Sequence, residues 1–146
     1  MTDEFLLLRR VSRPVPLDAY DETPPGLILL FFAAPGGAPD LAGGIATVSV
    51  REQADAVVVS LTERALEGIH PDGSVAAAIA LWRPDCLAIR LAGGLSDRMV
   101  RDGATGQPVR RLGADPARRH DDALFARAAA ERGCPVWPLE EPLSRG

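Results

Sequence analysis

The segment from Asp85 to Arg111, DCLAIRLAGGLSDRMVRDGATGQPVRR, limits the possible folds more than any other part of the chain. Apolar and polar residues alternate over 86–91, which is typical of a half-buried strand. A Gly-Gly pair interrupts this pattern, and a glycine-rich run at 102–106 follows. Asp-Gly and Thr-Gly permit the positive φ angles of a tight turn, so the segment predicts the last strand of a sheet followed by a hairpin corner.

The glycine-rich run resembles a phosphate-binding loop only in its glycine content. It lacks the Gly-Lys-Ser/Thr ending, and no helix pattern follows it. Without a helix, no dipole and no row of backbone amides would face an anion. The residue pattern therefore favours a turn over an anion site.

The other predicted strands belong to a meander. Residues 45–50 and 56–62 alternate with period two around a polar connection, which is the pattern of an antiparallel hairpin. Residues 75–82, VAAAIALW, precede a predicted turn at Pro84-Asp85 and are assigned to a strand, although their alanines leave a helix open. We expect strands in the order 45–50, 56–62, 75–82 and 86–91.

The N-terminal part is rich in proline and glycine, which exclude helices and central strands at those positions. Two apolar islands between these breakers predict short strands at 4–11 and 26–33. The second island, LILLFFAA, is apolar on both faces, as in a strand that is buried on both sides.

The strongest helix signal lies near the C-terminus. Asp115 is a good capping residue, and Pro116 suits the first helical position. Leu124 and Phe125 begin an apolar stripe, and Gly133 stands where a left-handed terminal residue belongs.

We therefore expect a single α+β domain over 1–146, with a mainly antiparallel meander sheet of about five to seven strands and one C-terminal helix at about 116–132. Residues 1–44 form its Pro/Gly-rich N-terminal part. Residues 134–146 form a tail that adds an edge strand near Val136-Trp137 and then frays.

Charge is distributed unevenly along a chain whose formal net charge is −4. All sixteen basic residues are arginine, which is typical of a GC-rich genome such as an actinobacterial one. Residues 98–119 contain six arginines and two acids, so a local basic patch is expected there. The negative total argues against a protein that coats nucleic acid, because that task needs many neutralised phosphates.

Two cysteines, Cys86 and Cys134, fit a reduced cytosolic protein with incidental buried thiols, and a single disulfide between them stays open. Their spacing does not suggest a zinc site. The first residues, MTDEFLLLRR, lack the basic region and cleavage site of a signal peptide. The eight-residue apolar run at 27–34 is too short to span a bilayer. We expect a cytoplasmic protein with no membrane association.

The segment LSDRMVRDGATGQPV, residues 95–109, resembles a recurrent LGDRxVxDxxTGxPV ending in uncharacterised actinobacterial proteins. The matching residues are Leu95, Asp97, Arg98, Val100, Asp102, Thr105, Gly106, Pro108 and Val109. Ser96 departs from the pattern, which has glycine there. The resemblance implies a shared structural corner and no assigned activity, and the proteins that carry it are often exported.

The candidate binding residues are the arginines that flank the hairpin and open the helix, together with the two histidines. They are Arg98, Arg101, Arg110, Arg111, Arg118, Arg119, His70 and His120. If the hairpin lies beside the helix N-terminus, the six guanidinium groups share one surface that would attract an acidic or phosphate-bearing ligand.

No catalytic residue is assigned, because no serine lies in a G-x-S-x-G pattern and neither cysteine has an activating environment in the sequence. No metal or other cofactor is expected. The chain is interpreted as a non-catalytic binding or interaction module, whose partner is another protein or a second copy. The alternative is a small enzyme or small-molecule-binding protein that uses His70 or His120 with the patch arginines.

Overall fold

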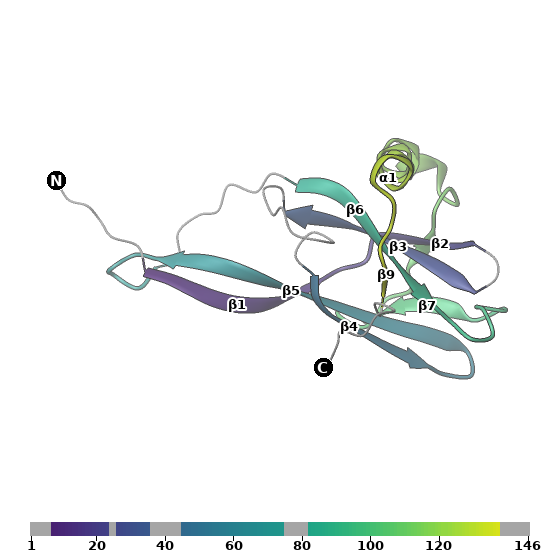
Figure 1. The fold of residues 1–146 in the computed structure, drawn as a ribbon, viewed down its shortest axis with the longest axis horizontal. Helices are drawn as coiled ribbons and strands as arrows, with labels where there is room; N and C mark the ends of the chain where they lie inside the picture. Colours follow the sequence, from purple (N-terminus) through teal and green to yellow (C-terminus); the bar gives the residue numbers. More distant parts are fainter. Residues whose placement is uncertain (1–6, 24–25, 36–44, 75–81, 138–146) are drawn as a thin grey trace, which may run out of the picture.

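Two β-sheets lie face to face in the computed structural model, which describes residues 7–23, 26–35, 45–74 and 82–137 (Figure 1). Most of the described residues are in strands, and the helix lies near the C-terminus. The predicted α+β class is therefore confirmed. The strands form two layers, whereas the sequence predicted one continuous meander.

The first sheet is built around the long strand β5, which pairs antiparallel with β1 and β4 and parallel with the short β7. Its strands are β1 (Leu7–Val15), β4 (Ile45–Glu52), β5 (Ala56–Ile69) and β7 (Met99–Asp102). The predicted hairpin of 45–50 with 56–62 is confirmed, and β5 continues well past its predicted end.

The second sheet has the strand order β8-β2-β3-β6-β9. Its strands are β2 (Ala19–Thr23), β3 (Leu27–Pro35), β6 (Trp82–Arg90), β8 (Arg110–Arg111) and β9 (Val136–Trp137). The central pairs are antiparallel, and β8 and β9 join the edges in parallel. The edge strand predicted at Val136-Trp137 is confirmed; the end of the tail, 138–146, lies outside the described residues.

The main core fills the space between the sheets. Its fully buried side chains alternate along their strands, with Val57, Val59 and Leu61 from β5 meeting Leu30 from β3 and Leu87 from β6. Alternation places every second residue on the inner face, which is why the period-two pattern of β5 was readable in the sequence.

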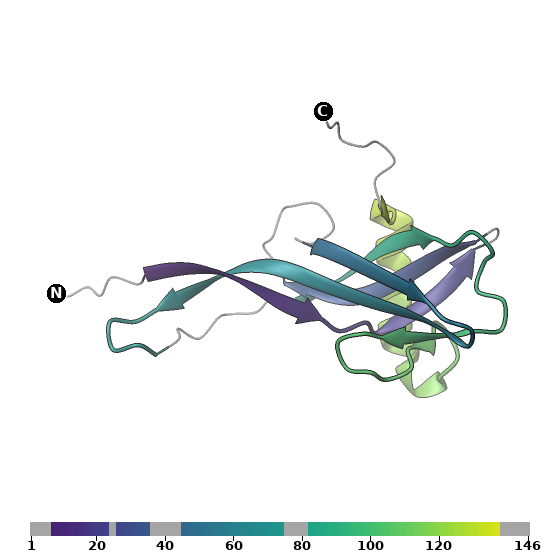
Figure 2. The ribbon, with the colours of Figure 1, turned by 90° about the horizontal axis from the view of Figure 1, so that it is seen from below.

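The helix α1 (Arg119–Arg132) covers the outer face of the second sheet and follows a 3₁₀ turn at Pro116–Arg118 (Figure 2). The Asp115 side chain accepts a hydrogen bond from the Ala117 backbone, as expected for a cap. Phe125 packs on Phe31 with ring centroids 5.6 Å apart. Since Leu30 and Phe31 point to opposite faces, β3 is buried on both sides, as its continuous apolar run predicted.

A disulfide joins Cys86 of β6 to Cys134, directly after α1. The expectation of two incidental thiols is therefore wrong, and the alternative that the sequence left open is correct. The cause is tertiary: α1 runs back across β6, so that two residues 48 apart in sequence have Cα atoms 5.1 Å apart.

The predicted meander order is also wrong after β5. The next described strand, β6, pairs with β3 and β9 in the second sheet rather than with β5. Residues 75–81 lie outside the described residues, so only Trp82 of the predicted strand 75–82 is seen, at the start of β6.

The predicted turn at Pro84-Asp85 lies inside β6 instead. Alternate amides of a strand point to the same side, and the Ala88 amide bonds Pro135 on the β9 side. The N–H that Pro84 lacks would point to this same side, and no described strand pairs with β6 there at Pro84. A proline is therefore tolerated at this position.

A two-stranded arm projects from the first sheet. We define the arm as residues 7–12 and 64–69, which pair from Leu7 with Ile69 to Ser12 with Arg64. The pairing of β4 with β5 ends at Glu63, so these residues of β5 have only β1 as a partner strand among the described residues. Figures 1 and 2 both show the ribbon of β1 and β5 extending beyond the two-layer body.

Candidate functional site

Arg98 is a structural cross-link between two loops. Its guanidinium donates to the Gly94 carbonyl at 2.7 Å, to the Leu95 carbonyl at 3.2 Å and to Glu52 at 3.0 Å. The side chain is only 16% exposed. These bonds fasten the loop before β7 to the turn between β4 and β5, so Arg98 has little capacity left for a ligand.

Arg101 and Asp102 stabilise the glycine-rich corner. Arg101 donates to the Gly106 carbonyl at 2.8 Å across the turn. Asp102 is buried, and its carboxylate accepts hydrogen bonds from the backbone amides of Leu17 and Ala104. These two side chains thus hold the glycine-rich corner in place, and the prediction of a turn at 102–106 is supported by the positive φ of Gly106.

Arg110 and Arg118 form an ionic network with three aspartates at the start of α1. Arg110 lies 2.7 Å from Asp122 and 3.7 Å from Asp18. Arg118 lies 3.0 Å from Asp18 and 3.1 Å from Asp121. The Arg110 hydrogen bond, followed by the Gly113 amide that donates to the same carboxylate, holds the pKa of Asp122 below its usual range.

The remaining patch residues are more exposed. Arg111 lies 3.5 Å from Asp21, and its guanidinium is over the Tyr20 ring at 5.9 Å from the centroid. Arg119 and His120 are exposed on the first turn of α1. They line a shallow surface hollow with Pro116 and Ala117.

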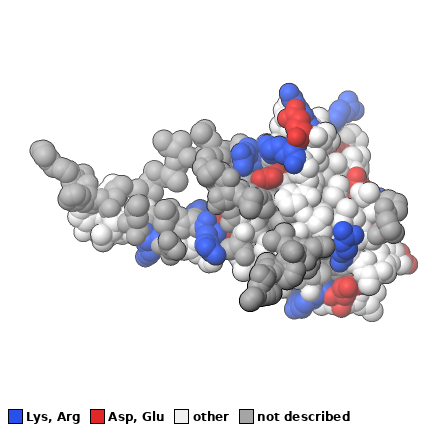
Figure 3. All heavy atoms as spheres, in the orientation of Figure 1, with Lys and Arg blue, Asp and Glu red and all other residues white. Residues whose placement is uncertain are grey.

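The expected basic surface is therefore largely neutralised. Arg98 bonds the turn between β4 and β5 and Arg101 bonds the glycine-rich corner, both outside the network at α1, so the six arginines do not share one surface. Where α1 begins, the four remaining arginines are accompanied by five aspartates, Asp18, Asp21, Asp115, Asp121 and Asp122. Figure 3 shows the opposite end of α1, the C-terminal end, toward the viewer, and blue and red side chains lie next to one another there as well.

His70 lies far from the patch, in the turn that ends the arm. The turn is closed by backbone hydrogen bonds between His70 and both Gly73 and Ser74. Asp72 accepts bonds from the Ser74 amide and hydroxyl, and these bonds lower its pKa. The nearby carboxylate thus serves the turn itself, as an Asp in a Pro-Asp-Gly turn commonly does.

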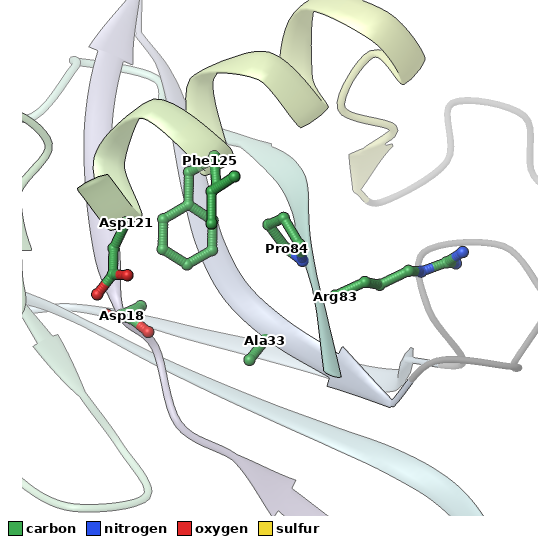
Figure 4. A pocket seen from close by; sticks show the side chains of 7 residues that line it. Asp18, Ala33, Arg83, Pro84, Asp121 and Phe125 are labelled. Carbon is green, nitrogen blue, oxygen red and sulfur yellow. The ribbon is translucent and has the colours of Figure 1, made fainter. Parts of the chain in front are cut away.

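A pocket beside α1 contains residues that the sequence analysis did not select. Asp18, Ala33, Arg83, Pro84, Asp121, Leu124 and Phe125 line it. They come from the segment before β2, from β3, from β6 and from α1 (Figure 4). No local motif marks them, because only the packing of α1 against the second sheet brings them together. The one sequence signal was Leu124, an apolar residue on the helix stripe that is 37% exposed.

Comparison with known proteins found no matching family model, no similar curated protein and no similar solved structure. Within the described residues, no group of three or more His, Cys, Asp or Glu side chains could hold a metal ion. None of the helices described is long and apolar enough to cross a membrane.

Proposed function

We propose that the chain is a non-catalytic interaction module that associates with a second copy of itself through the arm. The observation that carries this proposal is the projection of the two-stranded arm beyond the sandwich. Its reach is about 20 Å at the usual rise per strand residue. Two strands alone bury too little apolar surface to be stable, so a ribbon of this length gains from a partner.

The tip of the arm supplies an apolar contact. Leu7 is 70% exposed and pairs in register with the half-buried Ile69. Pro14 and the arginines of β1 oppose continuous pairing of a new strand along its outer edge. We therefore expect the tip side chains to make the contact, rather than the strand edge.

Charge favours a second copy as the partner. The arm contains Arg9, Arg10 and Arg64 against Glu67 alone, a formal charge of +2. Because the whole chain carries −4, the remainder carries −6. An arm of one sign and a body of the other attract each other between copies, and salt weakens that attraction.

The absence of catalysis is part of the proposal. His70 lies in the turn at the end of the arm and His120 on the exposed first turn of α1, so the described structure does not bring them into one cavity. The patch aspartates weaken the alternative of an acidic or phosphate-bearing ligand, because they already pair with Arg110 and Arg118. Arg119 is the patch arginine that has no side-chain partner among the described residues.

Light scattering on eluting protein tests self-association. We expect a mass of twice 15.5 kDa at low salt and a shift towards 15.5 kDa as salt is raised. Leu7→Asp should give the monomer. Met99→Asp is the control, because Met99 is a 41% exposed apolar residue on β7, outside the arm. Even a weak contact of this kind should have a Kd of about 0.1 mM or below. A wild-type protein that is still monomeric at a concentration of about 0.1 mM would therefore refute the proposal.

The disulfide also bears on the cellular compartment in which we propose that the protein works. The sequence favoured a cytoplasmic protein, but a disulfide such as Cys86–Cys134 persists in oxidising compartments and is rare in the cytosol. We therefore propose an oxidising compartment and keep the cytoplasm as the alternative. Trapping free thiols in intact producing cells, before lysis, distinguishes the two: two alkylated cysteines would support the cytoplasm.

A further inference from the structure

The pocket beside α1 has an apolar wall. Ala33, Pro84 and Phe125 line one side of it, and Leu124, which is 37% exposed, lines it as well. Phe125 is held by its contact with Phe31, so this wall is rigid. The cavity volume is about 230 Å³. At about 30 Å³ for each water-sized group, it has room for about eight such groups, which is close to the size of a small amine.

Two carboxylates lie at one end of the pocket, in the ionic network described above, whose three aspartates and two arginines leave a formal charge of −1. In Figure 4 the carboxylates of Asp18 and Asp121 lie close together on one side, and the Arg83 guanidinium extends away from the cavity. Arg118 donates to Oδ1 of Asp18 at 3.0 Å and to Oδ2 of Asp121 at 3.1 Å. The other oxygen of each carboxylate accepts no hydrogen bond from the described residues, so two acceptor oxygens are left for a ligand.

Arg118 also fixes these two carboxylates in place. It holds one oxygen of each carboxylate and is not among the residues that line the pocket. Carboxylates that are already held in position lose little conformational freedom when a ligand binds. Their arrangement suits a donor-rich cation, because an ammonium has three N–H donors and no acceptor.

We infer that this pocket binds a small organic cation, namely a primary ammonium carried on a short apolar stem. The ammonium donates to the two open oxygens of Asp18 and Asp121, and the stem packs on Phe125 and Leu124. An aromatic wall near the cation adds a favourable electrostatic contact. A carboxylate of the same shape is repelled by the two aspartates. The site is independent of the arm and of self-association.

Phenethylamine is a suitable probe, because its nine non-hydrogen atoms are close in number to the roughly eight water-sized groups that the cavity holds. Amide chemical shifts of the ¹⁵N-labelled protein would be followed during titration. We expect saturable shifts at Ala33 and in the first two turns of α1, with a Kd on the order of 1 mM for a ligand of this size. Two molecules of similar shape, 2-phenylethanol and 3-phenylpropionate, should bind at least tenfold more weakly.

Two variants test the two halves of the site. Asp121→Asn removes one charge at nearly constant shape and should weaken phenethylamine binding at least fivefold. Leu124→Lys places an ammonium of the chain itself in the lining of the pocket and should abolish binding. Glu131→Gln is the matched control, because it removes a carboxylate from the same helix that is 61% exposed and does not line the pocket.

The results that would overturn the inference are equally specific. They are shifts that do not saturate, shifts centred outside the pocket, binding of 3-phenylpropionate as tight as that of the amine, or unchanged binding in Leu124→Lys. If Asp121→Asn fails to fold, the Leu124→Lys variant decides the test, provided that its circular dichroism spectrum is the same as that of the wild type. Self-association measured on the same samples separates this result from the proposed function.

Discussion

Breaking the Cys86–Cys134 disulfide should destabilise the protein strongly, because the bond closes a loop over 48 positions of sequence. In the chain-entropy description, closing such a loop restricts the unfolded chain by about 4 kcal/mol at 25 °C. For a chain of this length, that corresponds to a fall in the melting temperature of roughly 10 °C. The reduced protein keeps both sulfur atoms, so it isolates the effect of the cross-link.

The assay is urea unfolding followed by tryptophan fluorescence, with and without a phosphine reductant. Cys86 is 1% exposed, so the native protein should resist reduction, and the reductant should be added to unfolded protein before refolding. The double variant Cys86→Ala/Cys134→Ala is the control, because the reductant should not change its stability. Its m-value should exceed that of the oxidised protein, since the unfolded chain is no longer cross-linked.

Two results would refute this reasoning. One is a difference of less than about 1 kcal/mol between oxidised and reduced protein, which is far below the chain-entropy value. The other is the titration of two free thiols in protein that was unfolded without reductant.

Three further predictions concern single residues. Arg98→Met should destabilise the fold by about 2 to 3 kcal/mol, because it leaves the carbonyls of Gly94 and Leu95 in one loop and of Gln53 in the other without their charged donor; an effect on urea unfolding no larger than that of Arg101→Met would contradict the cross-linking role. Ser96→Gly should stabilise by about 0.5 to 1 kcal/mol, since Ser96 has a φ of 60° that glycine adopts without strain; a lower melting temperature would count against this. Burial raises the pKa of Glu63, and Arg13 only partly offsets it, so the ionised form is less favourable in the folded state. The destabilisation by the ionised carboxylate is absent below about pH 4, the pKa of Glu63 in the unfolded chain, and complete above its pKa in the folded protein. Glu63→Gln should therefore be more stable than the wild type at pH 7 and equally stable at pH 3. A pH-independent gap in urea midpoints would exclude this explanation.

Local patterns in the sequence were sufficient for single elements. The alternation of 45–50 and 56–62, the cap at Asp115 and the glycine at 133 each predicted a feature that the structure has. These signals are local because backbone geometry and capping involve residues a few positions apart.

The arrangement of the strands was not local. The choice of β3 rather than β5 as the partner of β6 depends on which surfaces are buried once α1 covers the second sheet. A sequence pattern records that a strand is apolar on both faces but does not name its neighbours. The same limit explains why Pro84 was assigned to a turn.

The α+β class, the C-terminal helix and the turn at the glycine-rich corner could be predicted before folding was considered, because they depend on hydrophobic period and turn chemistry. The two-layer arrangement, the disulfide, the arm and the pocket at Asp18 and Phe125 depend on contacts between residues that are distant in the sequence. The same holds for the ion pairs of the arginines. The sequence shows which residues are charged, but folding alone brings an aspartate next to Arg110 or Arg118 and neutralises its charge.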